Sequence, residues 1–189
     1  MQTSIRWHSR AGQGAITAAN FLAEACAKLN FFTQSFPAFG AEKRGAPVIV
    51  FNRISKIKNN DPAFIQNPDI VILLDQTLVG EELSQAEILN GLPNDGKFII
   101  NTDGKKIDEF SKKFSGKIII IDATKIALET IGRNIPNVAM VGCITKILGI
   151  DKILVKKFLT QTLQKTFGEK LVEKNLLGFE RGYLESFVK

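Results

Sequence analysis

The sequence predicts an α/β fold: a Rossmann-like, mostly parallel sheet with helices on both faces and a C-terminal helical extension. Three observations lead to this prediction. Short apolar runs rich in β-branched residues alternate with helix-forming segments at the spacing of βαβ units. A glycine turn follows the first of these runs. Beyond residue 138 the apolar residues recur at the spacing of helix turns rather than that of strands.

The length and composition of the chain are those of one globular domain, which we expect to span residues 1–189. A chain of this size buries about 70% of its unfolded surface, so it forms a core without disulfides or metals. No apolar run is long enough to span a membrane, and the first residues lack the apolar segment of a signal peptide. We therefore expect a cytoplasmic protein.

The N-terminal part of the chain predicts strand, helix, strand and strand. Residues 4–7 form the first strand, and residues 15–28 form a helix that is apolar around much of its circumference and should be well buried. Residues 31–36 form a second strand, which ends at Pro37. Residues 48–53 form a third strand, which we expect to be antiparallel or at an edge of the sheet.

The alternation continues through the rest of the chain. Residues 70–74 are apolar on both faces, which is typical of a central parallel strand. Asp151 is placed to cap the next-to-last helix. The other predicted strands are residues 97–101 and 117–122, and the predicted helices are residues 81–89, 106–114, 123–131, 138–150, 151–167 and 169–187.

The last two predicted helices carry apolar stripes at helical spacing, so we expect them to pack on the sheet or partly on another subunit. The stripes consist of Leu154, Phe158, Leu159 and Leu163 in the first helix, and of Val172, Leu176, Phe179, Tyr183 and Phe187 in the second.

The chain has two cysteines, Cys26 and Cys143, which lie far apart in the sequence and in different predicted elements. Iron–sulfur clusters and structural zinc sites need more thiolates than these. Two buried, reduced thiols are the simpler interpretation. If the protein takes part in redox chemistry, we expect other chains to hold the electron carriers.

The positive charge of the chain is concentrated near the N-terminus. Residues 1–60 contain eight basic and two acidic residues, which accounts for the whole net charge of +6. A basic region beside a glycine turn suits a phosphorylated or carboxylate ligand, or an acidic partner. Nucleic acid is less favoured, because the chain has no Arg/Lys-rich helix and no strand that combines aromatic and basic residues.

Residues 10–15 form the first candidate motif, a glycine turn between a strand and a helix. This arrangement directs free backbone N–H groups at an anion. The candidate cofactor-binding residues are Arg10, Gly12, Gln13 and Gly14. Thr17 stands where a dinucleotide fingerprint has its third glycine, so NAD binding is weakly supported. A tight turn without any ligand remains an equally simple interpretation.

Residues 37–47 form the second candidate motif, a loop fixed by glycines and prolines that carries three consecutive charges. It has the glycine spacing of a P-loop but lacks the Lys-Ser/Thr pair, so we exclude nucleotide hydrolysis. The charges alone would fit a solvated surface run, but the rigid backbone favours an interface or ligand loop. Its candidate residues are Gly40, Glu42, Arg44, Gly45 and Pro47.

Three further polar residues end predicted strands. His8 is the only histidine, and a single histidine is more often a packing or hydrogen-bonding residue than a catalyst. Asp75 and Asp122 should lie at one edge of the sheet, where they would contact a ligand or cap turns and helices. No catalytic residue is identified by the residues alone.

The two motifs together resemble the gamma subunits of the 2-oxoacid:ferredoxin oxidoreductase family, which includes pyruvate:ferredoxin oxidoreductase (pyruvate synthase). Residues 7–14 and 36–47 carry the resemblance, and residues 52–55, 67–69 and 137–142 also match the family pattern. Three positions depart from that pattern without removing the turn, since serine and alanine replace glycines and a cysteine replaces an alanine. They are Ser9, Ala11 and Cys143.

The resemblance implies a complex that converts a 2-oxoacid and coenzyme A to acyl-CoA and CO2 while it reduces ferredoxin or flavodoxin. It implies that alpha, beta and delta-type partner subunits hold thiamine diphosphate, Mg and 4Fe-4S clusters, and that this chain helps to bind coenzyme A. Pyruvate is the favoured substrate, while 2-oxoglutarate, branched-chain oxoacids and indolepyruvate remain open. No nucleic-acid or membrane partner is implied.

Two other functions remain open. In the first, the chain is a non-catalytic scaffold of the same complex, and its motif loops are purely interface. In the second, it is a stand-alone α/β domain that binds a small ligand. A scaffold predicts that substitutions in the loops change assembly and leave substrate kinetics unaltered. A stand-alone domain predicts a stable, active monomer.

Overall fold

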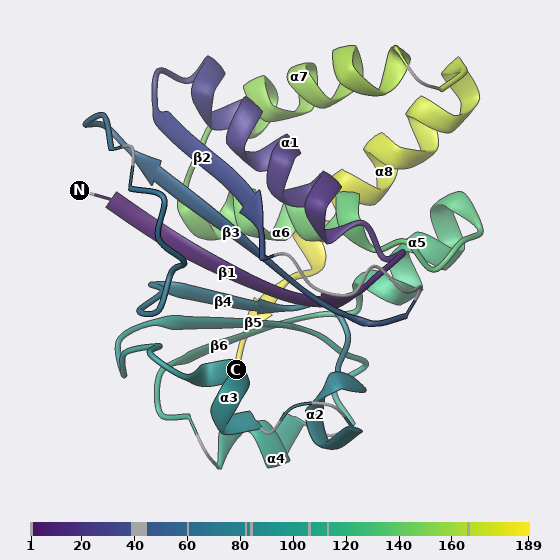
Figure 1. The fold of residues 1–189 in the computed structure, drawn as a ribbon. Helices are drawn as coiled ribbons and strands as arrows, with labels where there is room; N and C mark the ends of the chain where they lie inside the picture. The colour runs from purple at the N-terminus through teal and green to yellow at the C-terminus, as the bar shows by residue number, and fades with distance from the viewer. Residues whose placement is uncertain are drawn as a thin grey trace.

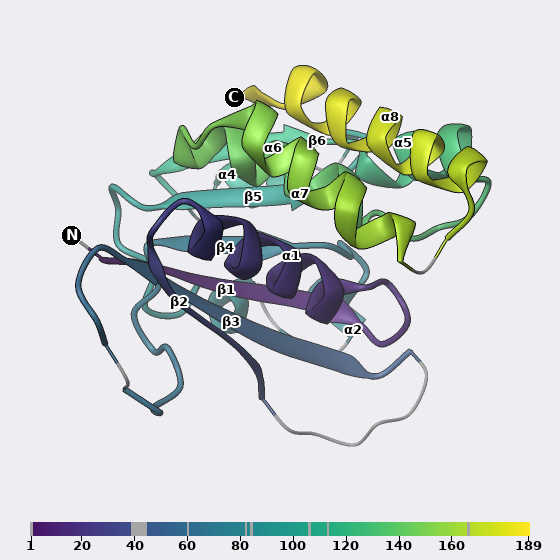
Figure 2. The ribbon, with the colours of Figure 1, turned by 90° about the horizontal axis from the view of Figure 1, so that it is seen from above.

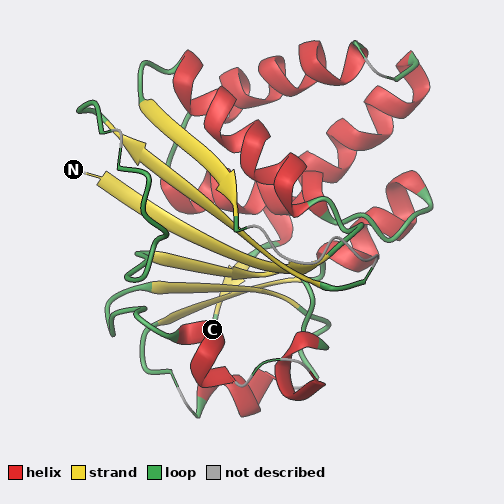
Figure 3. Ribbon diagram, viewed as in Figure 1, coloured by secondary structure: helices red, strands yellow, loops and turns green. Residues whose placement is uncertain are grey.

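A seven-stranded sheet forms the centre of the molecule (Figures 1 and 3). The computed structural model describes residues 2–38, 45–59, 61–81, 83, 85–105, 107–112, 114–165 and 167–189. The strand order is β2-β3-β1-β4-β5-β6-β7. The strands are β1 (Gln2–Arg10), β2 (Phe32–Pro37), β3 (Pro47–Ser55), β4 (Ile70–Leu73), β5 (Lys97–Asn101), β6 (Lys117–Ile121) and β7 (Phe187–Val188).

Five of the seven strands run in one direction, which confirms the prediction of a mostly parallel sheet. Strands β1, β4, β5 and β6 pair in parallel, whereas β3 is antiparallel to both of its neighbours and β7 is antiparallel to β6. Strand β3 is therefore antiparallel, as expected, but it lies inside the sheet between β2 and β1 and not at an edge. The edge position belongs to β2.

Helices cover both faces of the sheet, as Figures 1 and 2 show. Helices α1, α5, α6, α7 and α8 pack on one face, and the shorter α2, α3 and α4 lie on the other. None of the described helices is long and apolar enough to cross a bilayer. The helices are α1 (Ala15–Lys28), α2 (Leu78–Glu81), α3 (Gln85–Leu89), α4 (Ile107–Ser111), α5 (Ala123–Ile131), α6 (Asn137–Leu148), α7 (Lys152–Gln164) and α8 (Glu169–Glu185).

The two faces of the central strands contribute side chains to two separate hydrophobic cores. In β4, Ile70 and Ile72 belong to the core under α1 and α6, whereas Val71 and Leu73 belong to the core under α3 and α4. All four side chains are buried. The apolar run is therefore continuous because both of its faces are covered, as expected for a central parallel strand.

The structure corrects two details of the predicted elements and leaves a third outside the described residues. The predicted helix over residues 81–89 is two short helices, α2 and α3. The predicted start of the next helix, at residue 106, lies outside the described residues. The last helix ends at Glu185, because Phe187 pairs with Ile120 and so gives β6 an antiparallel neighbour.

The apolar stripes of the last two helices are confirmed in part. Leu159 and Leu163 are buried in α7, and Val172 and Phe179 are buried in α8. Two predicted members are exposed instead. They are Leu154, at 46% exposed, where α7 buries Val155 in its place, and Phe187, at 57% exposed, which lies in the edge strand.

Glycines allow α6 and α8 to pack in close contact. A Cβ added to Gly142 in α6 would overlap the carbonyl oxygen of Phe179, and one added to Gly182 in α8 would overlap that of Ala139. Backbone therefore rests on backbone where the two helices cross, and any side chain would force them apart. This contact fixes the position of α6, whose first turn borders the candidate site described below.

Replacing Gly182 by alanine should destabilise the protein by about 2–3 kcal/mol, because the added methyl group overpacks the helix crossing. The matched control is Gly178→Ala in the same helix, whose Cβ would lie 3.4 Å from Thr130 Oγ1, an ordinary contact. That variant should be neutral or more stable, since alanine favours a helix by about 1 kcal/mol over glycine. Urea unfolding of the two variants checks the prediction, and equal midpoints would contradict it.

Candidate functional site

The two motif loops meet at the carboxyl end of β1. Antiparallel pairing of β1 with β3 brings Arg10 opposite Pro47. Beyond this pair the Ala11 amide donates to the Ala46 carbonyl at 2.9 Å, and the Gly45 amide donates to the Ala11 carbonyl at 3.2 Å. Segments more than thirty residues apart thus form one continuous ladder. The predicted loop residues Gly40, Glu42 and Arg44 lie outside the described residues.

The glycine turn leads from β1 directly into α1. Gly12 and Gly14 have φ angles of 102° and 81°, the left-handed region that glycine adopts without strain. Among the described residues no side chain caps α1 at Gly14, so within this part of the chain the first-turn amides have no side-chain acceptor at the cap. A Cβ on Gly14 would lie 2.7 Å from Asn137 Nδ2, so glycine also lets the starts of α1 and α6 approach each other.

Gln13 and Asp75 bridge the ends of β1 and β4. The Gln13 side chain donates from Nε2 to Asp75 Oδ2 at 2.6 Å, and its Oε1 accepts from the Arg10 amide at 2.9 Å. Asp75 Oδ1 in turn accepts from the Thr77 amide at 2.9 Å. These bonds link the glycine turn to the segment that follows β4, the parallel neighbour of β1.

Arg10 cross-links the same region. Its Nε donates to Thr77 Oγ1 at 3.1 Å and lies 3.7 Å from Asp75 Oδ2, while its Nη1 donates to the Gly45 carbonyl at 3.1 Å. The side chain therefore ties the second motif loop to the end of β4. In the structure Arg10 and Gln13 act as positioning residues, and their binding of a cofactor stays a prediction.

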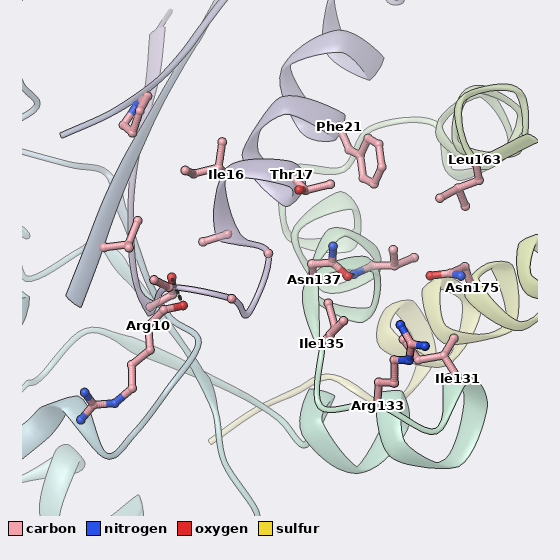
Figure 4. Close-up of a pocket in the computed structure, with 18 of the residues that line it drawn as sticks. Arg10, Ile16, Thr17, Phe21, Ile131, Arg133, Ile135, Asn137, Leu163 and Asn175 are labelled. Carbon is pink, nitrogen blue, oxygen red and sulfur yellow. Dashed lines mark hydrogen bonds between the residues drawn. The ribbon is translucent and has the colours of Figure 1, made fainter. Parts of the chain in front are cut away.

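A groove of about 740 Å³ opens beside the glycine turn, between α1, α7, α8 and the loop that follows α5 (Figure 4). Its lining combines cationic, polar and apolar side chains. Figure 4 shows Arg10 and Ile16 beside the glycine turn, Phe21 and Leu163 together toward α7, and Arg133 between Ile131 and Ile135. No aspartate or glutamate is found among the described residues that line it. The groove thus suits an anionic group joined to an apolar arm.

Sequence reasoning did not identify Arg133, Asn137 and Asn175 as groove residues. Arg133 follows Gly132, which caps α5 in the left-handed conformation, and Pro136 begins the next helix. Glycine and proline thus frame a charged loop here just as they frame residues 37–47. A charged loop bounded by glycine and proline was therefore the sequence feature that would have identified residues 132–136 as part of the site.

A smaller pocket of about 320 Å³ lies at the carboxyl ends of β4, β5 and β6. Asp75 and Asp122 both line it, which confirms that they share one edge of the sheet. Asp122 caps α5 by accepting from the Lys125 amide at 2.9 Å. Within the described part of the chain no group of three or more His, Cys, Asp or Glu residues is arranged to hold a metal ion.

His8 lies on the opposite face of the sheet from the groove and is only 3% exposed. Its Nε2 accepts from Arg6 Nε at 3.1 Å, and Nδ1 has no hydrogen-bond partner. Burial, and then the charge of Arg6, lower the pKa of His8 to about 3. His8 is therefore neutral at physiological pH and serves as a hydrogen-bonding core residue, as its isolation in the sequence led us to expect.

The buried imidazole makes stability depend on pH. Its pKa is about 3 in the folded protein and near 6.5 when unfolded, so the unfolded state binds more protons between these values. The free energy of unfolding should fall by up to ~1.4 kcal/mol per pH unit as pH decreases from about 6.5 toward 3. A His8→Gln variant should lose this contribution. Urea unfolding at several pH values measures the free energy of unfolding of both proteins. If it fell by the same amount in both as pH decreased, the prediction would be refuted.

Comparison with known proteins agrees with this geometry. A model of the pyruvate ferredoxin/flavodoxin oxidoreductase family matches residues 4–185. Pyruvate synthase subunit PorC of Thermotoga maritima is 41% identical over 185 residues, covering 96% of this chain and 93% of the relative. The pyruvate/ketoisovalerate oxidoreductases common subunit gamma of Thermococcus kodakarensis is 39% identical over 186 residues, with 97% of each chain covered.

The fold matches as well. The crystal structure of pyruvate oxidoreductase subunit PORC from Thermotoga maritima superposes with a TM-score of 0.85 at 37% identity, covering 100% of this chain and 98% of that one. The resemblance carried by the two motif loops is therefore confirmed over almost the whole sequence. The chain belongs to the pyruvate ferredoxin/flavodoxin oxidoreductase family.

Proposed function

We propose that this chain is the gamma-type subunit, formed by a single domain over residues 1–189, of a cytoplasmic 2-oxoacid:ferredoxin oxidoreductase. The assembled enzyme converts pyruvate, or a related 2-oxoacid, and coenzyme A to acyl-CoA and CO2 with reduction of ferredoxin or flavodoxin. Family membership and the names of the relatives, pyruvate synthase subunits and a subunit common to pyruvate and ketoisovalerate oxidoreductases, support this function.

Thiamine diphosphate, Mg and the 4Fe-4S clusters belong to alpha, beta and delta-type partner subunits in this proposal. The chemistry of the two cysteines supports it. The chain has two cysteines, both buried, which is fewer than the four thiolates that a cluster requires. The chain would then contribute substrate binding and assembly to the enzyme.

The groove beside the glycine turn is the proposed contact site for coenzyme A, and its lining of cationic and apolar side chains beside two helix N-termini is the observation that carries the proposal. The first turns of α1 and α6 border it and present the positive ends of two helix dipoles. Among the described residues that line it are two arginines and no carboxylate. Phosphates suit the helix N-termini and the guanidinium groups, and the pantetheine arm of coenzyme A suits the apolar side chains of the lining.

A Thr17→Glu substitution tests coenzyme A binding in the groove. Thr17 lies exposed in the first turn of α1 and lines the groove. A glutamate there favours the helix because it faces the positive end of the dipole, so folding should be preserved. The same charge repels an anionic ligand. In the assembled complex the KM for coenzyme A should rise about tenfold or more, with kcat little changed.

The matched control is Ala27→Glu, which adds the same charge at an exposed position near the other end of α1, outside the groove. That variant should keep the KM of the unmodified complex. Both complexes should elute with the same subunits in gel filtration. Equal KM values for the two variants would exclude the groove as the coenzyme A site.

A scaffold function is the second candidate, and the internal bonding of Arg10 and Gln13 favours it. Both side chains are used to position the motif loops, as an interface would require. Anaerobic purification of the chain from its native cells, with assays of 2-oxoacid- and coenzyme A-dependent dye reduction, identifies the partners and the oxoacid. A lone monomer without iron–sulfur and thiamine-binding partners would contradict both candidates.

A further inference from the structure

The two arginines of the groove are engaged differently. The guanidinium of Arg10 donates to Thr77 and to the Gly45 carbonyl and lies near the carboxylate of Asp75. Figure 4 shows it pointing away from the side chains of α1, α7 and α8 that line the groove. Its charge is therefore partly compensated by the protein, and its donors are committed to protein acceptors.

Arg133 has the opposite character. Within the described part of the chain its guanidinium makes no hydrogen bond or ion pair. Figure 4 shows the side chain rising between Ile131 and Ile135, toward the side of the groove where Asn137 and Asn175 lie. Its charge is therefore uncompensated and directed into the groove.

The backbone that carries Arg133 is held in place on both sides. The Gly132 amide donates to the Leu128 carbonyl at 3.1 Å, and the Ile135 amide donates to the Arg133 carbonyl at 2.9 Å. Pro136 then begins α6. A long cationic side chain on a fixed turn costs less entropy to order around a ligand than one on a mobile loop.

We infer that Arg133, and not the motif residue Arg10, is the cation that binds the anionic group of the groove's ligand. The inference rests on the proposed function, in which that ligand is coenzyme A and the group is a phosphate. The planar guanidinium presents paired N–H donors that match two phosphate oxygens, which an ammonium cannot reproduce. Arg10 then acts as a positioning residue for the glycine turn.

The test is made in the native complex with Arg133→Gln and Arg133→Lys variants. Arg133→Gln should raise the KM for coenzyme A at least about tenfold, the effect of losing a charge-assisted hydrogen bond, and leave kcat at saturation unchanged. Arg133→Lys should recover part of the loss. The increase of KM with salt should be weaker in the glutamine variant, because one screened attraction is missing.

Lys157→Gln, which removes an exposed charge of α7 outside the groove, is the control and should leave every parameter unchanged. Because Arg133 is exposed, the glutamine variant should also unfold at the same urea concentration as the unmodified chain.

The outcomes separate the inference from the proposed function. If Thr17→Glu raises the KM and Arg133→Gln does not, the assignment of Arg133 is overturned and the groove remains the coenzyme A site. If neither variant changes the KM, the groove itself is excluded, and the assignment of Arg133 is overturned with it. A loss of kcat at unchanged KM would also overturn the inference, because it would indicate a role other than ligand binding.

Discussion

The antiparallel pairing of β1 with β3 is the constraint on which the candidate site depends. Its register brings Arg10 opposite Pro47, so the glycine turn and the end of the second motif loop become neighbours although they are far apart in the sequence. Arg10 then ties both to β4 through Thr77. A slip of one residue would reverse the faces of β3 and separate these groups.

Close helix packing completes the site on the other side of α1. Gly142 and Gly182 let α6 and α8 touch backbone to backbone, and Gly14 lets the start of α1 approach Asn137. These close contacts at glycines thus determine the position of α6. The result is a groove that two helix N-termini border and that apolar side chains of α1, α7 and α8 help to line. Helix packing determines the shape of the groove. Among the described residues, the cationic side chains that line it are Arg10, at the glycine turn, and Arg133, in the loop that follows α5.

Local sequence patterns were sufficient for much of this architecture. The predicted helices at residues 15–28 and 123–131 match α1 and α5, and the buried run at residues 70–74 matches β4, because periodicity and caps are local properties. Long-range contacts determined what the patterns missed. Phe187 leaves the helix to pair with β6, and the function of Arg10 became clear only from its contacts with Thr77 and the Gly45 carbonyl.

We propose that coenzyme A binds in the groove of this subunit within the assembled enzyme. Hydrogen–deuterium exchange of the native complex, with and without coenzyme A, tests it most directly. Slower exchange in residues 12–18 and 131–138 on addition of coenzyme A is the predicted result, because the ligand would cover the starts of α1 and α6. Unchanged exchange in both segments, together with protection confined to other subunits, would contradict the account.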